Sequence, residues 1–243
     1  MRRSCSLWLI SIVVLLLAAC GKSGEITDAI SQPVTGVNLL TYDEREAGTD
    51  TYILRVLVSP DFLRLDDGYA ESDFALLERR SGTIFSVSHE DHSILVIENQ
   101  PGEAALPAEL TLTESRSVDD KAPAVAGKQA VHSQYLASGT LCYQALTIPG
   151  LMDDAVAAMA EYAEVLARRQ LNNMQTVPAN MQTPCFLSRY VYAPARHFRQ
   201  GLPVQEWDDT GYFRTLTDFS EDETMPAALF ELPGTYERFS PGQ

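Results

Sequence analysis

The stretch that decides the fold is residues 51–98, TYILRVLVSPDFLRLDDGYAESDFALLERRSGTIFSVSHEDHSILVIE. It consists of short segments rich in β-branched and aromatic residues, a composition that favours strands. Clusters of Asp, Gly and Ser separate these segments and are typical of turns. Strands about 9–11 residues apart indicate an antiparallel meander rather than βαβ units. The expected segments are 51–58, 62–65, 73–79, 83–88 and 93–98.

The rest of the chain predicts more strands, with loops between them. Residues 119–130 and 171–184 are polar and indicate loops, and residues 220–223 indicate an acidic turn. Residues 208–211, DDTG, predict the turn of a late hairpin. Further strands are expected near Leu110 and Leu112 and at 132–136, 141–146, 185–192, 202–207 and 212–219.

One helix is predicted to begin near Met152 and to run for about four turns. Acidic residues lie in its first turn and Arg168 and Arg169 in its last, which suits the helix dipole. Its apolar residues recur at intervals of three and four, so we expect the helix to pack on the sheet. These residues are Ala155, Val156, Met159, Ala163 and Leu166.

The N-terminus has the pattern of an export signal. Arg2 and Arg3 precede the apolar run 7–17, and residues 17–21 read LAACG. This is a charged region, an apolar region and a small-residue cleavage site. The apolar run is shorter than the roughly 20 residues that a membrane-spanning helix needs, although an uncleaved anchor is the alternative.

This cassette resembles a bacterial lipoprotein signal peptide. The resemblance implies cleavage before Cys20 and acyl chains on that cysteine, which would anchor the protein in a membrane. We therefore expect a cleaved signal at 1–19, a lipidated tether at 20–35 and a single domain at 36–243. Gly21 in this pattern implies transport to an outer membrane, with the protein facing the periplasm.

The charge of the chain excludes some partners. The formal charge is −15, and loss of the two signal arginines would leave −17. Nucleic-acid binding needs many Lys and Arg residues to neutralise phosphates, so no nucleic-acid partner is expected. The acidity indicates a well-solvated surface, with recognition of a cationic partner or a metal as the alternative.

The cysteines suggest one disulfide. Cys5 would leave with the signal and Cys20 would be acylated, so Cys142 and Cys185 remain. Exported proteins meet an oxidising compartment, where a Cys142–Cys185 bridge is the default. The bridge would close a loop of about 43 residues, which contributes roughly 3–4 kcal/mol to the stability of the fold in the chain-entropy model. A reactive thiol pair is the alternative, but the spacing is not Cys-x-x-Cys.

No motif predicts catalysis or a cofactor. Residues 89–92, HEDH, are the best metal-like cluster, but they sit at a predicted hairpin tip and indicate a solvated turn. His132 and His197 stand alone and are expected to be structural or solvated. The pairs 66–67 and 208–209 fall at turns, where Asp is favoured. A glycosidase-type pair of carboxylates, distant in sequence and brought together by folding, stays an open alternative. No catalytic residue, metal ligand or cofactor is assigned.

The order of strands, helix and final hairpin resembles the LolA/LolB superfamily of periplasmic lipid-handling modules. Residues 62–68, FLRLDDG, and 229–236, LFELPGTY, are similar to short segments of that group. The resemblance implies a mainly β (α+β) fold, an open antiparallel half-barrel or curved sheet with one main helix packed on or in its concave face.

The resemblance to that fold implies a binding function and not a catalytic one. We expect a membrane-anchored, non-enzymatic lipoprotein that binds a hydrophobic ligand, such as a lipid, or an acylated protein partner. The second hypothesis is a structural or interaction module of an envelope assembly, with an envelope protein as its partner. The third is a metal-assisted hydrolase using residues 89–92.

Overall fold

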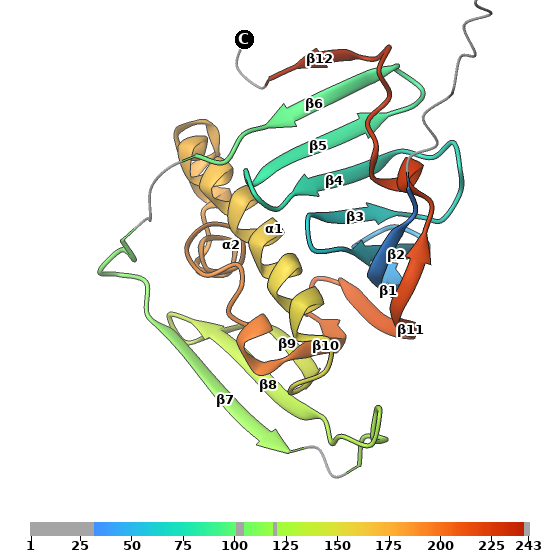
Figure 1. Cartoon of the computed structure of the whole chain (residues 1–243). Coiled ribbons are helices and arrows are strands. Elements are labelled where there is room, and N and C mark those ends of the chain that lie inside the picture. Colours follow the sequence, from blue (N-terminus) through green and yellow to red (C-terminus); the bar gives the residue numbers. More distant parts are fainter. Residues whose placement is uncertain (1–31, 101–104, 119–120, 241–243) are drawn as a thin grey trace, which may run out of the picture. The chain divides into compact units, whose positions relative to one another are not determined.

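The computed structural model describes residues 32–100, 105–118 and 121–240, and these form one open 12-stranded sheet (Figure 1). The strand order is β12-β6-β5-β4-β3-β2-β1-β11-β10-β9-β8-β7. The strands are β1 (Val34–Arg45), β2 (Tyr52–Val58), β3 (Phe62–Asp66), β4 (Phe74–Glu78), β5 (Thr83–Ser88), β6 (Ser93–Ile97), β7 (Leu112–Val118), β8 (Val131–Ala137), β9 (Thr140–Ile148), β10 (Leu202–Trp207), β11 (Phe213–Met225) and β12 (Glu237–Phe239).

The predicted meander is confirmed, because β2 to β6 are consecutive antiparallel neighbours in the sheet. The expectation of a wholly antiparallel sheet is wrong at one edge. There β12 runs parallel to β6, with Glu237 opposite Ser93. The Glu237 N–H donates to the His92 carbonyl at 3.1 Å, so the C-terminal segment pairs at the start of β6. The sheet is therefore mixed.

Strand β1 is central to the sheet and is not among the strands predicted from the sequence. It begins at Val34, two residues inside the expected 20–35 tether, and pairs with both β2 and β11. The expected acidic turn at 220–223 is wrong, because these residues continue β11. Register shifts opposite Val37 and Leu39 accommodate this irregular stretch. The backbone hydrogen bonds offered by β1 outweigh the local turn composition.

The predicted helix is α1 (Asp153–Asn172), which lies across one face of the sheet (Figure 1). It begins directly after Met152, and it packs against β2, β3, β5 and β10. Ala155 and Met159 are buried in this interface, whereas Leu166, in the same apolar stripe, is 36% exposed. Within the described residues, no helix is both long enough and apolar enough to cross a membrane.

Residues 185–192 are helical, so the predicted strand there is wrong. Helix α2 (Pro184–Leu187) continues into a π-helical turn at Ser188–Tyr192. Thr183 caps α2, because its Oγ1 accepts the Phe186 N–H at 3.2 Å, and Pro184 stands at the start, where its missing N–H costs nothing. These start signals outweigh the β propensity of the residues that follow. Short 3-10 turns occur at Met174–Thr176, Ala179–Met181, Phe198–Gln200 and Ala227–Phe230.

Candidate functional site

A cavity of about 460 Å³ lies between α1 and the strands β2 and β3. Its volume is in the range of roughly 300–1,000 Å³ typical of small-molecule sites. The walls are largely apolar, and the exposed Leu166 of α1 is one of them. The wall residues from these three elements include Leu54, Val56, Leu63, Leu65, Met159, Tyr162, Ala163 and Leu166.

One end of the cavity is built from buried charged groups. Nε2 of His197 lies 3.2 Å from Oε1 of Glu206 on β10. The other oxygen of Glu206 accepts a hydrogen bond from Arg214, its cross-strand partner on β11. The Tyr143 hydroxyl lies 3.3 Å from Nδ1 of His197. Strands β9, β10 and β11 thus meet the His197 loop in one network of hydrogen bonds and ion-pair contacts.

The electrostatics of this network set the charges of its groups. Burial lowers the pKa of His197 to about 4, and attraction to Glu206 offsets this only in part, so the ring is neutral near pH 7. Nε2 faces the Glu206 carboxylate, and Nδ1 forms a hydrogen bond with the Tyr143 hydroxyl. Burial works to raise the pKa of Glu206, but the Arg214 guanidinium holds it below its usual value. Glu206 and Arg214 therefore form a buried ion pair.

Arg189, in the π-helical turn, lines the same end of the cavity. Its Nη1 donates to Asp208 at 2.7 Å, and its guanidinium carbon lies 4.3 Å from the ring centroid of Tyr212. Asp208 also accepts hydrogen bonds from the N–H groups of Thr210 and Tyr212, at 2.9 and 3.1 Å. The carboxylate predicted at this turn therefore holds the hairpin and orients Arg189.

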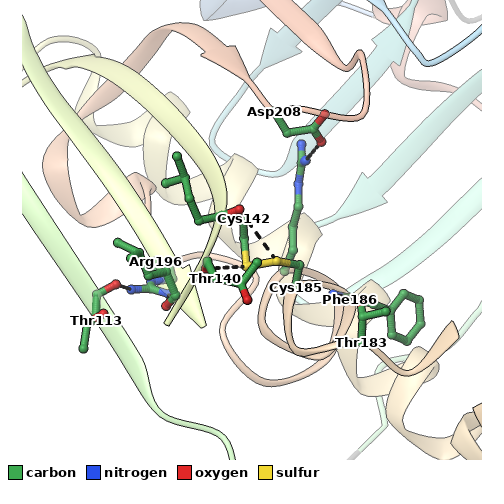
Figure 2. Close-up of a disulfide and its surroundings, with 11 residues drawn as sticks. Thr113, Thr140, Cys142, Thr183, Cys185, Phe186, Arg196 and Asp208 are labelled. Carbon is green, nitrogen blue, oxygen red and sulfur yellow. Dashed lines mark hydrogen bonds and ion pairs between the residues drawn. A yellow bond between two sulfur atoms is a disulfide. The ribbon is translucent and has the colours of Figure 1, made fainter. Parts of the chain in front are cut away.

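The disulfide joins Cys142 on β9 to Cys185 on α2, with their Cα atoms 5.0 Å apart (Figure 2). It fastens α2 to the sheet. Because α2 continues directly into the π-helical turn, the bridge also restrains Arg189 and Tyr190, which line the cavity. Cys20, the predicted lipidation site, lies outside the described residues.

The other sequence candidates have structural surroundings. The His89 ring packs edge-on against Phe74 and Tyr236, with centroids 5.8 and 5.6 Å away, and His92 also lies against Tyr236. No group of three metal-ligating side chains occurs in the described ranges. His132 stacks on Trp207. The turn at 89–92 therefore gives no support to a metal-assisted hydrolase.

Asp66 is buried between two arginines. Its oxygens accept hydrogen bonds from Arg55 at 2.7 and 2.9 Å and from Nε of Arg64 at 2.5 Å. Burial works against the charged form, but these hydrogen bonds hold the pKa of Asp66 below its ordinary value. Arg64 also donates to the Leu229 carbonyl at 2.8 Å. This cluster ties β3 to the C-terminal segment, so Asp66 has a structural role.

The charged end of the cavity was not predicted from the sequence. His197 stands alone in the sequence because its partners come from other strands. One signal was present: Glu206 and Arg214 flank the predicted 208–211 turn at matching positions of the hairpin. Such opposite charges on facing strands form cross-strand pairs.

Comparisons with known proteins assign no family. No protein-family model matches the chain, and no curated protein matches it. Among solved structures, it is similar to an uncharacterized conserved protein from Thermus thermophilus, with a TM-score of 0.42 and 10% identity over 84% of this chain and 90% of that one. It is also similar to PNGF-II in two crystal forms, with TM-scores of 0.38 and 0.39 and 7% identity. The matches cover 84% of this chain but only 31% and 32% of PNGF-II. At these TM-scores the likeness carries neither fold nor function over to this chain.

Proposed function

We propose that this protein binds a hydrophobic ligand, or the acyl chain of a partner, in the cavity between α1 and the sheet. The observation that carries the proposal is the apolar wall formed by β2, β3 and α1 around about 460 Å³ of space. An apolar cavity with a few polar groups at one end is the usual form of a small-molecule site. In this proposal the sheet acts as a half-barrel whose concave face is incompletely filled by α1.

The proposal is for binding and not for catalysis. The charged groups at the cavity end hold one another: Glu206 pairs with Arg214 and His197, and Arg189 pairs with Asp208. No Ser, Thr or Cys side chain is among the described residues that line the cavity. A Ser, Thr or Cys nucleophile activated by a neighbouring base, a common signature of covalent catalysis, is therefore not part of this lining.

We also propose that the protein works as an envelope lipoprotein anchored through Cys20. The export cassette at residues 1–21 supports this, and two or three acyl chains hold a protein on a membrane, whereas one holds it marginally. The polar residues after Cys20 would then tether the binding domain to an outer membrane. An anchored protein would receive its ligand at a fixed position and would not shuttle.

Native mass spectrometry of the full chain, sprayed from a nonionic detergent with palmitic acid as the probe, tests the binding proposal. The wild-type protein is expected to retain one palmitate. Ala163→Trp places an indole in the cavity and should reduce the bound fraction at least tenfold. Ala157→Trp makes the same change at an exposed position of the same helix and should bind as wild type does. If wild type binds no palmitate, or both variants bind it equally, the cavity is not the site.

A further inference from the structure

A second pocket adjoins the apolar cavity. It has a volume of about 300 Å³, and Ala167 and Pro194 line both spaces. Three arginines line it: Arg168 from α1, and Arg196 and Arg199 from the loop before β10. Glu164 is the acidic residue in the same lining. The chain has a formal charge of −15, so a local cluster of three arginines gives this pocket a charge opposite to that of the chain as a whole and favours anions there.

Arg196 is the informative residue of this pocket, because it is only 6% exposed. Its guanidinium donates to the carbonyls of Leu136 and Thr113 at 3.2 and 2.6 Å, the latter drawn in Figure 2. No carboxylate of the described chain lies within ion-pair distance of it. Buried charges in proteins are normally paired, since an unpaired one carries a large desolvation cost. The guanidinium carbon of Arg196 also lies 5.0 Å from the ring centroid of Tyr135. Two carbonyls and an aromatic face therefore surround this buried cation, and no carboxylate of the described residues does.

The neighbouring arginines are also incompletely neutralised. Arg168 donates to Asn99 at 2.8 Å and to the half-exposed Glu164 at 3.3 Å. Arg199 is exposed, and no hydrogen bond or ion pair joins it to the described residues. Planar guanidinium groups in such clusters suit the oxygens of phosphate and carboxylate groups, which they bind in bidentate fashion.

We propose that this arginine pocket binds the anionic head of the same ligand whose apolar chain occupies the cavity. The ligand is then an anionic amphiphile, with an oxyanion head and a hydrocarbon chain, and not a neutral lipid. This inference rests on the proposed function, because the chain must lie in the apolar cavity. The shared Ala167 and Pro194 place the two spaces next to each other, as a single ligand that spans both requires.

Binding of 12-carbon probes to the full chain, again by native mass spectrometry, tests this. Dodecyl phosphate, dodecanoate and dodecanol share the chain and differ in the head, and inorganic phosphate has no chain. At least one anionic probe should bind about tenfold more tightly than dodecanol, and the tighter of the two identifies the head. Arg199→Gln should weaken that probe roughly tenfold, as expected when a charge-assisted hydrogen bond is lost, and leave dodecanol unchanged. Arg199→Lys keeps the charge and should retain most of the preference.

The outcomes separate the two proposals. If dodecanol binds as tightly as both anionic probes and Arg199→Gln changes nothing, the head-group inference is wrong while the cavity proposal stands. If no 12-carbon probe binds, both are wrong. If inorganic phosphate binds as tightly as dodecyl phosphate, the arginine pocket is an anion site that makes no use of a chain, and the amphiphile is rejected.

Discussion

Nε2 of His197 lies 3.2 Å from Oε1 of Glu206 at the charged end of the cavity. The two residues come from the loop before β10 and from β10 itself, and both are buried. Arg189, Arg196 and Arg214 also act on the ring, and all three oppose its protonation. The contact therefore depends on a neutral imidazole beside an ionised carboxylate.

Acidification should destabilise the protein through His197. Its pKa is about 4 in the folded chain and 6.5 as the ordinary value, so the unfolded chain binds the proton more readily. The contribution of His197 is complete above pH 6.5 and is lost progressively as the pH falls toward 4. Between pH 7 and pH 5 the loss should be about 2 kcal/mol. Urea unfolding at both pH values measures it.

His197→Gln removes the titrating ring and should flatten this dependence of the unfolding free energy on pH. Tyr143→Phe is the matched control, because it deletes the hydroxyl that reaches Nδ1 but keeps the imidazole. It should be less stable at every pH and retain the wild-type slope. Equal slopes in wild type and His197→Gln would contradict the assignment.

Removing the Asp66 carboxylate should lower the free energy of unfolding much more than removing the carboxylate of Asp67. Asp66→Ala leaves Arg64, which is 5% exposed, without its carboxylate, so a loss of about 3–5 kcal/mol is expected. Asp67 accepts a hydrogen bond from the Tyr69 N–H, and Asp67→Ala should cost about 1 kcal/mol. Chemical denaturation compares the two. Hydrogen exchange at residues 226–232 should also accelerate in Asp66→Ala alone, because Arg64 holds the Leu229 carbonyl. Similar losses in both variants would refute the structural role.

Gly201 is required by close backbone packing. Its φ is +113°, and a Cβ there would lie 2.3 Å from the Ile148 carbonyl oxygen, which cannot move aside easily. Gly201→Ala should therefore cost about 3 kcal/mol or more, from backbone strain and overpacking together. Gly139 has φ +80° and open space around it, so Gly139→Ala should cost about 1–2 kcal/mol. Denaturant midpoints that do not differ between the two variants would show that the clash is relieved.

Reduction of the Cys142–Cys185 bridge should weaken both the fold and the cavity. The bridge closes a loop with a sequence separation of 43, which corresponds to about 4 kcal/mol in the chain-entropy model. Urea unfolding with and without reductant measures this, and the Cys142→Ser, Cys185→Ser double variant should match the reduced protein. Palmitate binding should fall as well, because α2 leads into the turn that carries Arg189. A protein equally stable in both redox states would argue against a stabilising bridge.

The anchoring proposal predicts that Cys20→Ala abolishes incorporation of radiolabelled palmitate when the chain is made in a diderm bacterium. Cys5→Ala should be labelled as wild type is, because Cys5 precedes the predicted cleavage point. The label in the wild-type protein should also fractionate with the outer membrane. Palmitate retained by Cys20→Ala would mean that the lipid is attached elsewhere or that the leader is not a lipoprotein signal.

Local patterns predicted much of the sheet. In residues 51–98 each strand and its turn fall within about ten residues, and the neighbouring strand in sequence is also the neighbour in space. The hairpin around 208–211 is likewise formed by strands that are neighbours in sequence. Helix α1 was predictable because the spacing of its apolar residues marks the face that packs on the sheet. The strand predicted at 185–192 is wrong because local β propensity takes no account of the Thr183 cap and the bridge at Cys185.

The sequence alone was sufficient for the charge, the meander and the main helix, because each depends on residues close together in the chain. The export signal at residues 1–21 stays a prediction from the same kind of local pattern. Tertiary structure decided the parallel pairing of β12, the path of β11 along β1 and the two adjoining pockets. His197 meets Tyr143 across 54 residues, and Arg64 meets Leu229 across 165. Contacts at such separations depend on how the sheet brings its strands together, and no spacing within a single segment encodes them.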